Sequence, residues 1–282
     1  MKKITGIHYT GERAVFRGRD LDFCECLFDD GESPLKESEN IKLTDCTFGW
    51  KYPLWYSKDV EAEDCLWQDT ARAGVWYTEN IVIRNTKVLA PKNFRRCKDI
   101  ILENIELPNA QETLWACEDV ELNNVKVSGN YFGMNCSRVT VDNLDLDGDY
   151  GFDGARDIVI RNSSLKTKDA FWNCENVTVI NSTIVGEYFG WNSKNITLIN
   201  CEIESLQGFC YIEGLKLVNC KLGNTTLSFE YCKNIDADIV GTVDSVKNPI
   251  SGVIVADGIG ELILEEDKVD PKKTKIVVRE KA

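Results

Sequence analysis

The stretch Asn195-Ile196-Thr197-Leu198-Ile199-Asn200 decides the fold, because versions of it recur along almost the whole chain. Its apolar anchor, Ile196, belongs to a series in which successive members lie 19 to 21 residues apart: Leu21, Ile41, Val60, Ile81, Ile100, Val120, Val139, Ile158, Val177, Ile196, Leu215 and Ile235. A fixed period of this length is typical of a solenoid, in which one short unit stacks on copies of itself.

Each repeat has a strand pattern that ends at a polar corner. The anchor and the apolar residue two positions later alternate as strand residues do. Ten of the twelve repeats carry Asn or Asp just before the anchor. Four residues after the anchor, ten consecutive repeats carry Asp or Asn: Asp45, Asp64, Asn85, Asn104, Asn124, Asn143, Asn162, Asn181, Asn200 and Asn219. Asn tolerates the left-handed backbone of a sharp corner, and stacked Asn side chains hydrogen-bond along a ladder.

The repeat is too short for a helix. Only about eight of its residues lie outside the strand and corner, and no 3.6-residue period is sustained. Parallel crossovers are overwhelmingly right-handed. The sequence therefore predicts an all-β, single-stranded, right-handed parallel β-helix of about 12 coils with a period of about 19 residues. The alternative is a solenoid like that of leucine-rich repeats, whose pattern residues 57–67 match only in part.

The repeat also predicts the organisation of the chain. We expect residues 1–282 to form a single domain. Residues 1–11 would be a lead-in segment, residues 12–240 the β-helix coils, and residues 241–282 irregular coils and a C-terminal cap. A cap is expected because an exposed terminal coil is a free edge strand.

The chain has 12 cysteines, and most of them fall on two repeat positions. One position holds Cys97, Cys117, Cys136, Cys174 and Cys232, and the other holds Cys26, Cys46, Cys65, Cys201 and Cys220. Ser, Thr, Ala or Val take the same places in other repeats, which indicates a small core filler rather than disulfides. Free thiols favour a reducing compartment, so we expect a cytoplasmic protein.

Charge and composition exclude several function classes. The net charge of −13 disfavours nucleic acid and anionic membranes as partners, and no apolar stretch is long enough to span a membrane. His8 is the only histidine, so we expect neither a Ser-His-Asp triad nor a His-based metal site. We expect no metal site and no cofactor, apart from weak Ca²⁺ binding by an Asp cluster.

One column of the repeat is not explained by the architecture. Four successive repeats place these residues at one equivalent position: Tyr131, Tyr150, Asp169 and Tyr188. Tyrosine rings beside carboxylates can stack on sugars and hydrogen-bond to them. The candidate binding residues are Tyr131, Tyr150, Tyr188 and Glu187. Two carboxylates about 5–10 Å apart can act as acid and base on a glycoside. The candidate catalytic residues are Asp147, Asp149 and Asp169.

The segment before each anchor has two further features. Trp and Phe recur there, as in Phe171-Trp172, and two adjacent apolar positions compete for one interior site. Their inward or outward orientation stays open, although we expect the tryptophans in the core. Lys92, Arg95, Arg96 and Lys98 form a small basic patch, which could bind an anionic group but is expected to be a solvated edge.

Over nearly its full length, the chain resembles an uncharacterised bacterial β-helix family, the domain of unknown function 3737. The resemblance is carried by coils such as Asn80-Ile81-Val82-Ile83-Arg84-Asn85 and by the segment 245–252. It implies a pectin-lyase-like right-handed β-helix with no established activity, so it supplies no site residues. The chain lacks the combination of Asp-Asp and His-Gly signatures that is found in polygalacturonases, since Asp29-Asp30 alone is not evidence of it. The Arg-x-Pro-x-x-Arg element of pectate lyases is also absent.

The sequence leaves three functional hypotheses. The first is a non-catalytic β-helix scaffold that binds a carbohydrate or a protein surface. The second is a carbohydrate-active hydrolase or lyase that uses Asp residues on one β-helix face. The third is an acidic mimic of DNA, suggested by the net charge of −13, although the acids do not form continuous outward columns.

Overall fold

Parallel pairing between consecutive repeats organises the whole chain. The computed structural model describes residues 1–280, which fall into two compact units, Met1–Asp145 and Leu146–Ala282. The described residues contain β-strands and one short 3-10 helix, η1 (Pro271–Lys273), and no α-helix. Together the units contain about 15 turns of a parallel β-solenoid with a period of about 19 residues. This confirms the predicted all-β solenoid.

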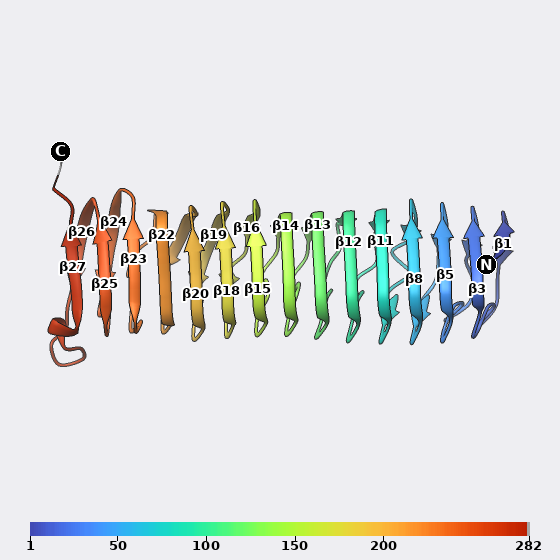
Figure 1. Ribbon diagram of the computed structural model, residues 1–282, viewed down its shortest axis with the longest axis horizontal. Coiled ribbons are helices and arrows are strands. Elements are labelled where there is room, and N and C mark those ends of the chain that lie inside the picture. The colour runs from blue at the N-terminus through green and yellow to red at the C-terminus, as the bar shows by residue number, and fades with distance from the viewer. Residues whose placement is uncertain (281–282) are drawn as a thin grey trace. The chain divides into compact units, whose positions relative to one another are not determined.

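Unit 1 stacks the anchor strand of each turn on that of the next (Figure 1). Leu21 lies opposite Ile41, Ile41 opposite Val60, and the register continues to Val120. The strands of the unit are β1 (Lys2–Thr5), β2 (His8–Tyr9), β3 (Arg19–Cys24), β4 (Leu27–Phe28), β5 (Glu39–Thr44), β6 (Thr47–Phe48), β7 (Leu54–Trp55), β8 (Lys58–Glu63), β9 (Leu66–Trp67), β10 (Val75–Trp76), β11 (Glu79–Val88), β12 (Lys98–Leu107) and β13 (Glu118–Ser128), followed by β14 (Ser137–Asp147) at its end.

Unit 2 repeats this arrangement. Ile158 lies opposite Val177, Val177 opposite Ile196, and Ile196 opposite Leu215. Its strands are β15 (Arg156–Arg161), β16 (Ser164–Lys166), β17 (Asp169–Ala170), β18 (Glu175–Ile180), β19 (Thr183–Phe189), β20 (Lys194–Ile199), β21 (Glu202–Gln207), β22 (Glu213–Gly223), β23 (Ile235–Ile239), β24 (Thr242–Lys247), β25 (Gly252–Ala256), β26 (Gly258–Ile263) and β27 (Thr274–Val278).

The strand ladder extends beyond residues 12–240. β1 pairs with β3, and β25 and β27 continue the ladder from β23. The anchor position in these turns is occupied by Lys2, Gly252 and Thr274, which lack the apolar signature. This explains why about 15 turns are present where the sequence predicts about 12. The single-domain assignment stays a prediction, and Lys281 and Ala282, the end of the predicted cap, lie outside the described residues.

Every repeat turns at residues with a left-handed backbone. The position before the anchor has a positive φ in all twelve repeats, including Arg138 and Gly214, and so does the position four residues before the anchor. The position four residues after the anchor has a positive φ from Glu25 to Asn219. Left-handed angles are uncommon outside glycine and are tolerated best by Asn and Asp. The recurring Asn and Asp residues therefore lie where the backbone requires them.

The predicted Asn ladder is present in both units. In unit 1, Asn104 donates its side-chain amide to Asn85 at 3.0 Å, Asn124 donates to Asn104 at 2.7 Å, and Asn143 donates to Asn124 at 2.9 Å. In unit 2, Asn200 and Asn219 continue the same pattern. Each amide donates to one neighbour and accepts from the next, so the ladder holds successive turns in register.

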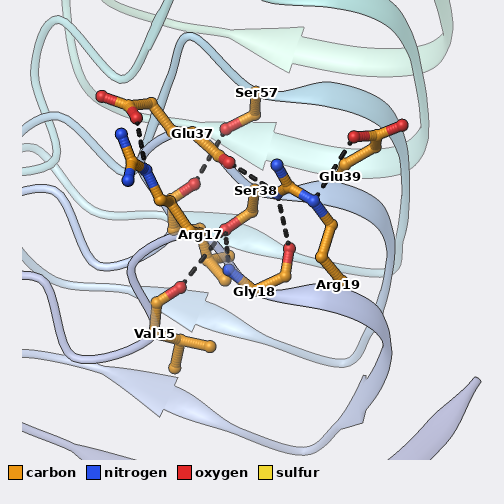
Figure 2. A network of polar contacts seen from close by, with 9 residues as sticks. Val15, Arg17, Gly18, Arg19, Glu37, Ser38, Glu39 and Ser57 are labelled. Atoms are coloured by element: carbon orange, nitrogen blue, oxygen red, sulfur yellow. Dashed lines mark hydrogen bonds and ion pairs between the residues drawn. The ribbon is translucent and has the colours of Figure 1, made fainter.

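A buried column of hydroxyls and thiols lies three residues before nine of the twelve anchors. Ser38 Oγ donates to the Val15 carbonyl at 3.2 Å (Figure 2). In the next turn, Ser57 Oγ donates to the Leu35 carbonyl at 2.8 Å. Cys117 and Cys136 do the same to Phe94 and Leu114, both at 3.0 Å. The interpretation of these cysteines as filler is therefore incomplete, because the thiols also satisfy buried carbonyls of the preceding turn.

Aromatic stacks fill the rest of the interior. In unit 1, Phe28 stacks on Phe48 with ring centroids 4.9 Å apart, and Phe48 contacts Trp67 at 4.8 Å. In unit 2, a continuous buried series consists of Phe152, Phe171, Phe189, Phe209 and Phe229. Stacked copies bury apolar surface that a single turn would leave exposed, which is the main source of solenoid stability.

The ladder predicts an order of stability at Asn124. Replacing Asn124 with Ala removes two side-chain hydrogen bonds and places a Cβ-bearing residue of low left-handed propensity at φ 54°. We expect Asn124→Ala to lower the free energy of unfolding by about 2 kcal/mol, and Asn124→Gly by about 1 kcal/mol, because Gly accepts the backbone angle. Urea unfolding followed by circular dichroism measures both. An Ala variant as stable as the Gly variant would contradict the backbone argument.

Candidate functional site

The segment before each anchor places its tryptophans outside. Six residues before the anchor the side chain is buried, as at Leu54, Val75 and Phe171, whereas the next residue is half-buried and faces outward. The half-buried tryptophans at this repeat position are Trp55, Trp76, Trp115, Trp172 and Trp191. The expectation that these tryptophans lie in the core is therefore wrong, because the preceding aliphatic or Phe side chain already fills the interior.

The candidate residues of the sequence fall in both units. Tyr131 belongs to unit 1 and is 37% exposed, whereas Asp147, Asp149, Tyr150, Asp169, Glu187 and Tyr188 belong to unit 2. Asp147 is exposed and forms an ion pair with Lys166 at 3.2 Å. An Asp149 carboxylate oxygen accepts the backbone N–H of Lys168 at 3.3 Å. The site described below is the part of this set that unit 2 assembles.

Asp169 is the unusual group of this site. Its side chain lies on β17 and the residue is only 5% exposed. One carboxylate oxygen, Oδ1, is buried without a hydrogen-bond partner. Burial, together with the nearby carboxylates of Asp153 and Glu187, raises the pKa of Asp169 to about 6. A buried carboxyl with a raised pKa and a free oxygen can hold or release a proton near neutral pH.

The neighbours of Asp169 form a mixed carboxylate and aromatic cluster. Lys168 Nζ lies 3.6 Å from the Glu187 carboxylate, which keeps that carboxylate paired. The hydrogen bond to Glu187 and its charge raise the pKa of the Tyr188 hydroxyl. Burial raises the pKa of Asp153, although its hydrogen bond with Asn173 opposes the change. We call Asp153, Lys168, Asp169, Glu187 and Tyr188 the Asp169 cluster.

Close backbone packing sets the position of the Asp169 cluster. The N–H groups of Glu187 and Tyr188 both donate to the Lys168 carbonyl at 2.9 Å, which draws β19 toward the preceding turn. Just before them is Gly186, where a Cβ would lie 2.1 Å from the Thr167 carbonyl oxygen. Only glycine permits this approach. Tyr188 is thereby held opposite Asp169 in the strand register.

An outward aromatic row leads away from the cluster. Tyr188 contacts Trp191 edge-on with ring centroids 6.1 Å apart, Trp191 stacks on Tyr211 at 5.4 Å, and Tyr211 contacts Tyr231 at 5.3 Å. We call Tyr188, Trp191, Tyr211 and Tyr231 the aromatic row. Tyr211 is 46% exposed, so the row is accessible to a ligand.

A groove of about 350 Å³ lies beside the far end of the aromatic row. Its walls combine two tyrosine rings with amide, ammonium and carboxylate groups. The lining residues that can make polar contacts or stack are Asn192, Lys194, Tyr211, Glu213, Tyr231 and Lys233. Apolar surface flanked by a few polar groups is typical of small-ligand sites.

Sequence reasoning did not assign Trp191, Tyr211 or Tyr231 to a site, and it missed the groove. Tyr211 and Tyr231 share the corner position four residues before the anchor, and other repeats place Tyr, Asn, Arg, Glu, Ala or Gly there. This corner therefore shows no constant residue type. The available signal was a bulky aromatic side chain at a position with φ of 55° for Tyr211 and 54° for Tyr231, where a small residue would be less strained.

The described residues contain neither a metal-binding cluster nor a helix that could span a membrane. Within residues 1–280, no group of three or more His, Cys, Asp or Glu side chains is arranged to hold a metal ion. No helix in the same part of the chain has the length and hydropathy to cross a membrane.

Comparison with known proteins identifies the family. The family model described as "Protein of unknown function (DUF3737)" matches residues 2–277. The chain belongs to this family. No sequence among the curated proteins matches it significantly.

Several solved structures are similar in fold. The tailspike protein of E. coli bacteriophage HK620, in complex with a pentasaccharide, has a TM-score of 0.46 at 9% identity and covers 98% of this chain and 71% of its own. The Streptococcus pneumoniae surface protein and adhesin PfbA has a TM-score of 0.40 at 12% identity, and the match covers 77% of this chain and 76% of PfbA. The A-module of the Azotobacter vinelandii mannuronan C-5 epimerase AlgE4 has a TM-score of 0.36 at 10% identity, and the match covers 97% of this chain and 87% of the A-module. These similarities concern the fold alone.

Asp169 predicts a pH-dependent stability. Because its folded pKa of about 6 lies above the ordinary aspartate value of 3.8, the folded state binds the proton more tightly than the unfolded state. Its contribution is therefore most favourable below the unfolded pKa and is lost as pH rises through about 6. We expect Asp169→Asn to be more stable than the natural protein at pH 8, with the difference shrinking toward pH 4. Urea midpoints at both pH values measure this.

The control for Asp169→Asn is Asp147→Asn, which removes one carboxylate from an exposed ion pair. Exposed pairs contribute little, so its urea midpoint should change little at either pH. A uniform loss of stability for Asp169→Asn across the pH range would show that the buried carboxylate is well accommodated, contrary to this account.

Proposed function

We propose that this protein is a non-catalytic scaffold that binds a carbohydrate on unit 2. The ligand would lie on the aromatic row and in the adjoining groove. The observation that carries the proposal is the continuous series of ring contacts from Tyr188 to Tyr231, which ends beside a groove lined with hydrogen-bonding groups. Tyrosine and tryptophan combine apolar ring surface with a polar group, which suits the mixed surface of a sugar.

Tyr211 and Tyr231 lie at a backbone corner that is strained for a bulky side chain. Tyr211 and Tyr231 take left-handed angles at a corner where Asn173 and Asn192 occupy the two preceding turns. Asn suits this backbone better than a bulky ring does. Such a backbone angle costs of order 1 kcal/mol or more, so it persists only where the surrounding structure holds it in place. Residues strained in this way cluster at functional sites. Tyr56 and Tyr77 take the same angle at the equivalent corner of unit 1, so the strain is compatible with a ligand-binding role and the ring contacts and the groove carry the proposal.

The charges of the groove favour a ligand that has no net charge. Lys194 lies opposite Glu213 in the strand register, and Glu213 lies opposite Lys233. Cations and a carboxylate therefore alternate along the groove. Such a surface offers donors and acceptors to hydroxyl groups without a strong field of one sign. We also propose a cytoplasmic location, which the 12 free thiols of the chain support.

Binding of neutral oligosaccharides tests the proposal. Tyr211→Ala and Tyr231→Ala should each weaken binding about tenfold, since removing one stacked aromatic contact costs roughly 1–1.5 kcal/mol. Isothermal titration against a panel of neutral oligosaccharides measures the affinity. Tyr56→Ala is the matched control, because Tyr56 is 50% exposed and belongs to unit 1. Equal losses in all three variants, or no binding by the natural protein, would overturn the proposal.

A second candidate function is favoured by the Asp169 cluster. Glycoside hydrolysis requires one carboxyl that is protonated and one carboxylate that is ionised. Asp169, with a pKa of about 6, meets the first requirement, and Glu187, paired with Lys168, meets the second. In this alternative the protein is a hydrolase or lyase, Asp169 protonates the leaving-group oxygen, and Glu187 activates water or the sugar.

Product release separates the two functions. If the cluster is catalytic, reducing ends or unsaturated sugars appear with oligosaccharides, and the rate falls as pH rises above about 6 because Asp169 loses its proton. Asp169→Asn should then abolish turnover and leave binding intact, whereas Tyr211→Ala should weaken binding. Chromatography of the reaction products measures turnover. Binding without any product supports the scaffold and rejects the enzyme.

A further inference from the structure

The outer surface of unit 1 carries a separate column of stacked side chains. Trp55 stacks on Trp76 with ring centroids 5.1 Å apart and an interplanar angle of 8°. The Arg95 guanidinium carbon lies 4.7 Å from the Trp76 ring and 4.9 Å from the Trp115 ring. We call Trp55, Trp76, Arg95 and Trp115 the Trp–Arg column. All four occupy the half-buried position five residues before the anchor.

The Trp–Arg column is held rigidly in place. Trp55 Nε1 donates to the Ala73 carbonyl at 2.6 Å, and Trp76 Nε1 donates to the Lys92 carbonyl at 2.9 Å. Arg95 Nη2 donates to the Glu112 carboxylate at 3.0 Å. Beside the column, Tyr56 and Tyr77 stack at 4.7 Å with an interplanar angle of 5°. A surface whose side chains are fixed before binding loses little conformational entropy when a partner docks.

The stacking leaves a positive surface facing solvent. Both faces of Trp55 and of Trp76 are covered by a neighbouring ring or by Arg95, and Arg95 covers one face of Trp115. The exposed parts of Trp55 and Trp76 are therefore ring edges, which carry the positive end of the aromatic quadrupole. Residues 52–56, 73–77 and 92–96 contain no Asp or Glu and three cations, Lys92, Arg95 and Arg96. In the fourth turn of the column, Glu112 pairs with Lys92 at 3.2 Å and with Arg95 at 3.0 Å, so the four segments keep a net charge of +2. Arg96 is exposed and forms no ion pair with a described residue. In a chain of net charge −13, this is a local reversal of sign.

We propose that the Trp–Arg column, with Tyr56, Tyr77 and Arg96, docks an extended acidic segment of a partner protein. Trp, Tyr and Arg are the residues most enriched at the energetic centres of protein interfaces. The column crosses four turns at about 4.8 Å each, which matches roughly four to five residues of an extended chain. A carboxylate of the segment contacts Arg96, which has no ion pair with a described residue, and the apolar side chains of the segment contact the indole edges.

The geometry favours an acidic peptide over single-stranded nucleic acid. Nucleic-acid bases bind by stacking on free aromatic faces, and the faces of Trp55, Trp76 and Tyr77 are already in contact with neighbouring rings. The same surface accounts for the basic patch predicted from the sequence. Arg95 is stacked between two indole rings, whereas Arg96 is exposed as expected for a solvated edge. This docking surface is independent of the carbohydrate proposed for unit 2.

Fluorescence anisotropy with short labelled peptides tests the proposal. The probe is a hexapeptide of alternating Glu and Leu, and the neutral comparison replaces each Glu with Gln. We expect the full-length protein to bind the Glu peptide more tightly, with an affinity that falls as salt rises. Arg96→Gln should weaken binding about five- to tenfold. The matched control is Lys98→Gln, which removes one exposed cation outside the column and should change binding less than twofold.

Three outcomes would overturn the proposal. The first is failure of the Glu peptide to bind more tightly than the Gln peptide. The second is an equal effect of Arg96→Gln and Lys98→Gln, which would mean that only net charge matters. The third is tighter binding of an oligouronate or of an oligothymidylate than of the Glu peptide, which would assign the surface to an acidic sugar or to single-stranded nucleic acid.

Discussion

The left-handed backbone at the corners is the constraint on which the structure depends. A repeat of about 19 residues can close one turn and return to register only if the chain bends sharply several times. Positive φ angles make these bends at the positions four residues before the anchor, one before it and four after it. Such angles cost most residues of order 1–2 kcal/mol each. Asn and Asp reduce that cost, and their ladders then hold each turn in register with the next.

The same constraint separates structural polar residues from functional ones. Asn85, Asn104, Asn124 and their equivalents are used by the backbone and by one another. The Ser, Thr and Cys column is used by buried carbonyls, as Ser57 and Cys117 show. What remains is the outward surface before each anchor, where side chains vary from turn to turn. The aromatic row and the Trp–Arg column lie there, whereas Asp169 is buried opposite Tyr188. We therefore place both proposed binding surfaces in this part of the repeat.

The fold could be predicted from the sequence because the backbone demands the same residue type in each turn. The anchor series and the Asn ladder are visible for this reason. The corner four residues before the anchor is equally left-handed, yet it accepts Arg, Glu, Tyr, Ala, Gly and Asn, so it has no signature. The burial of Asp169 was not predictable because Tyr131 and Tyr150 occupy the same column in a left-handed conformation, whereas Asp169 lies on strand β17. The Trp positions stayed open because the pattern does not tell which of two adjacent apolar residues points inward.

Hydrogen–deuterium exchange in the presence of a bound neutral oligosaccharide tests the central claim most directly. The claim is that ligands contact the variable surface before the anchors and not the Asn ladders. We predict slower exchange in residues 187–194, 208–214 and 230–233 of unit 2, with no change at the ladder corners around Asn181, Asn200 and Asn219. Protection centred on those Asn corners, with none along the aromatic row, would contradict the account.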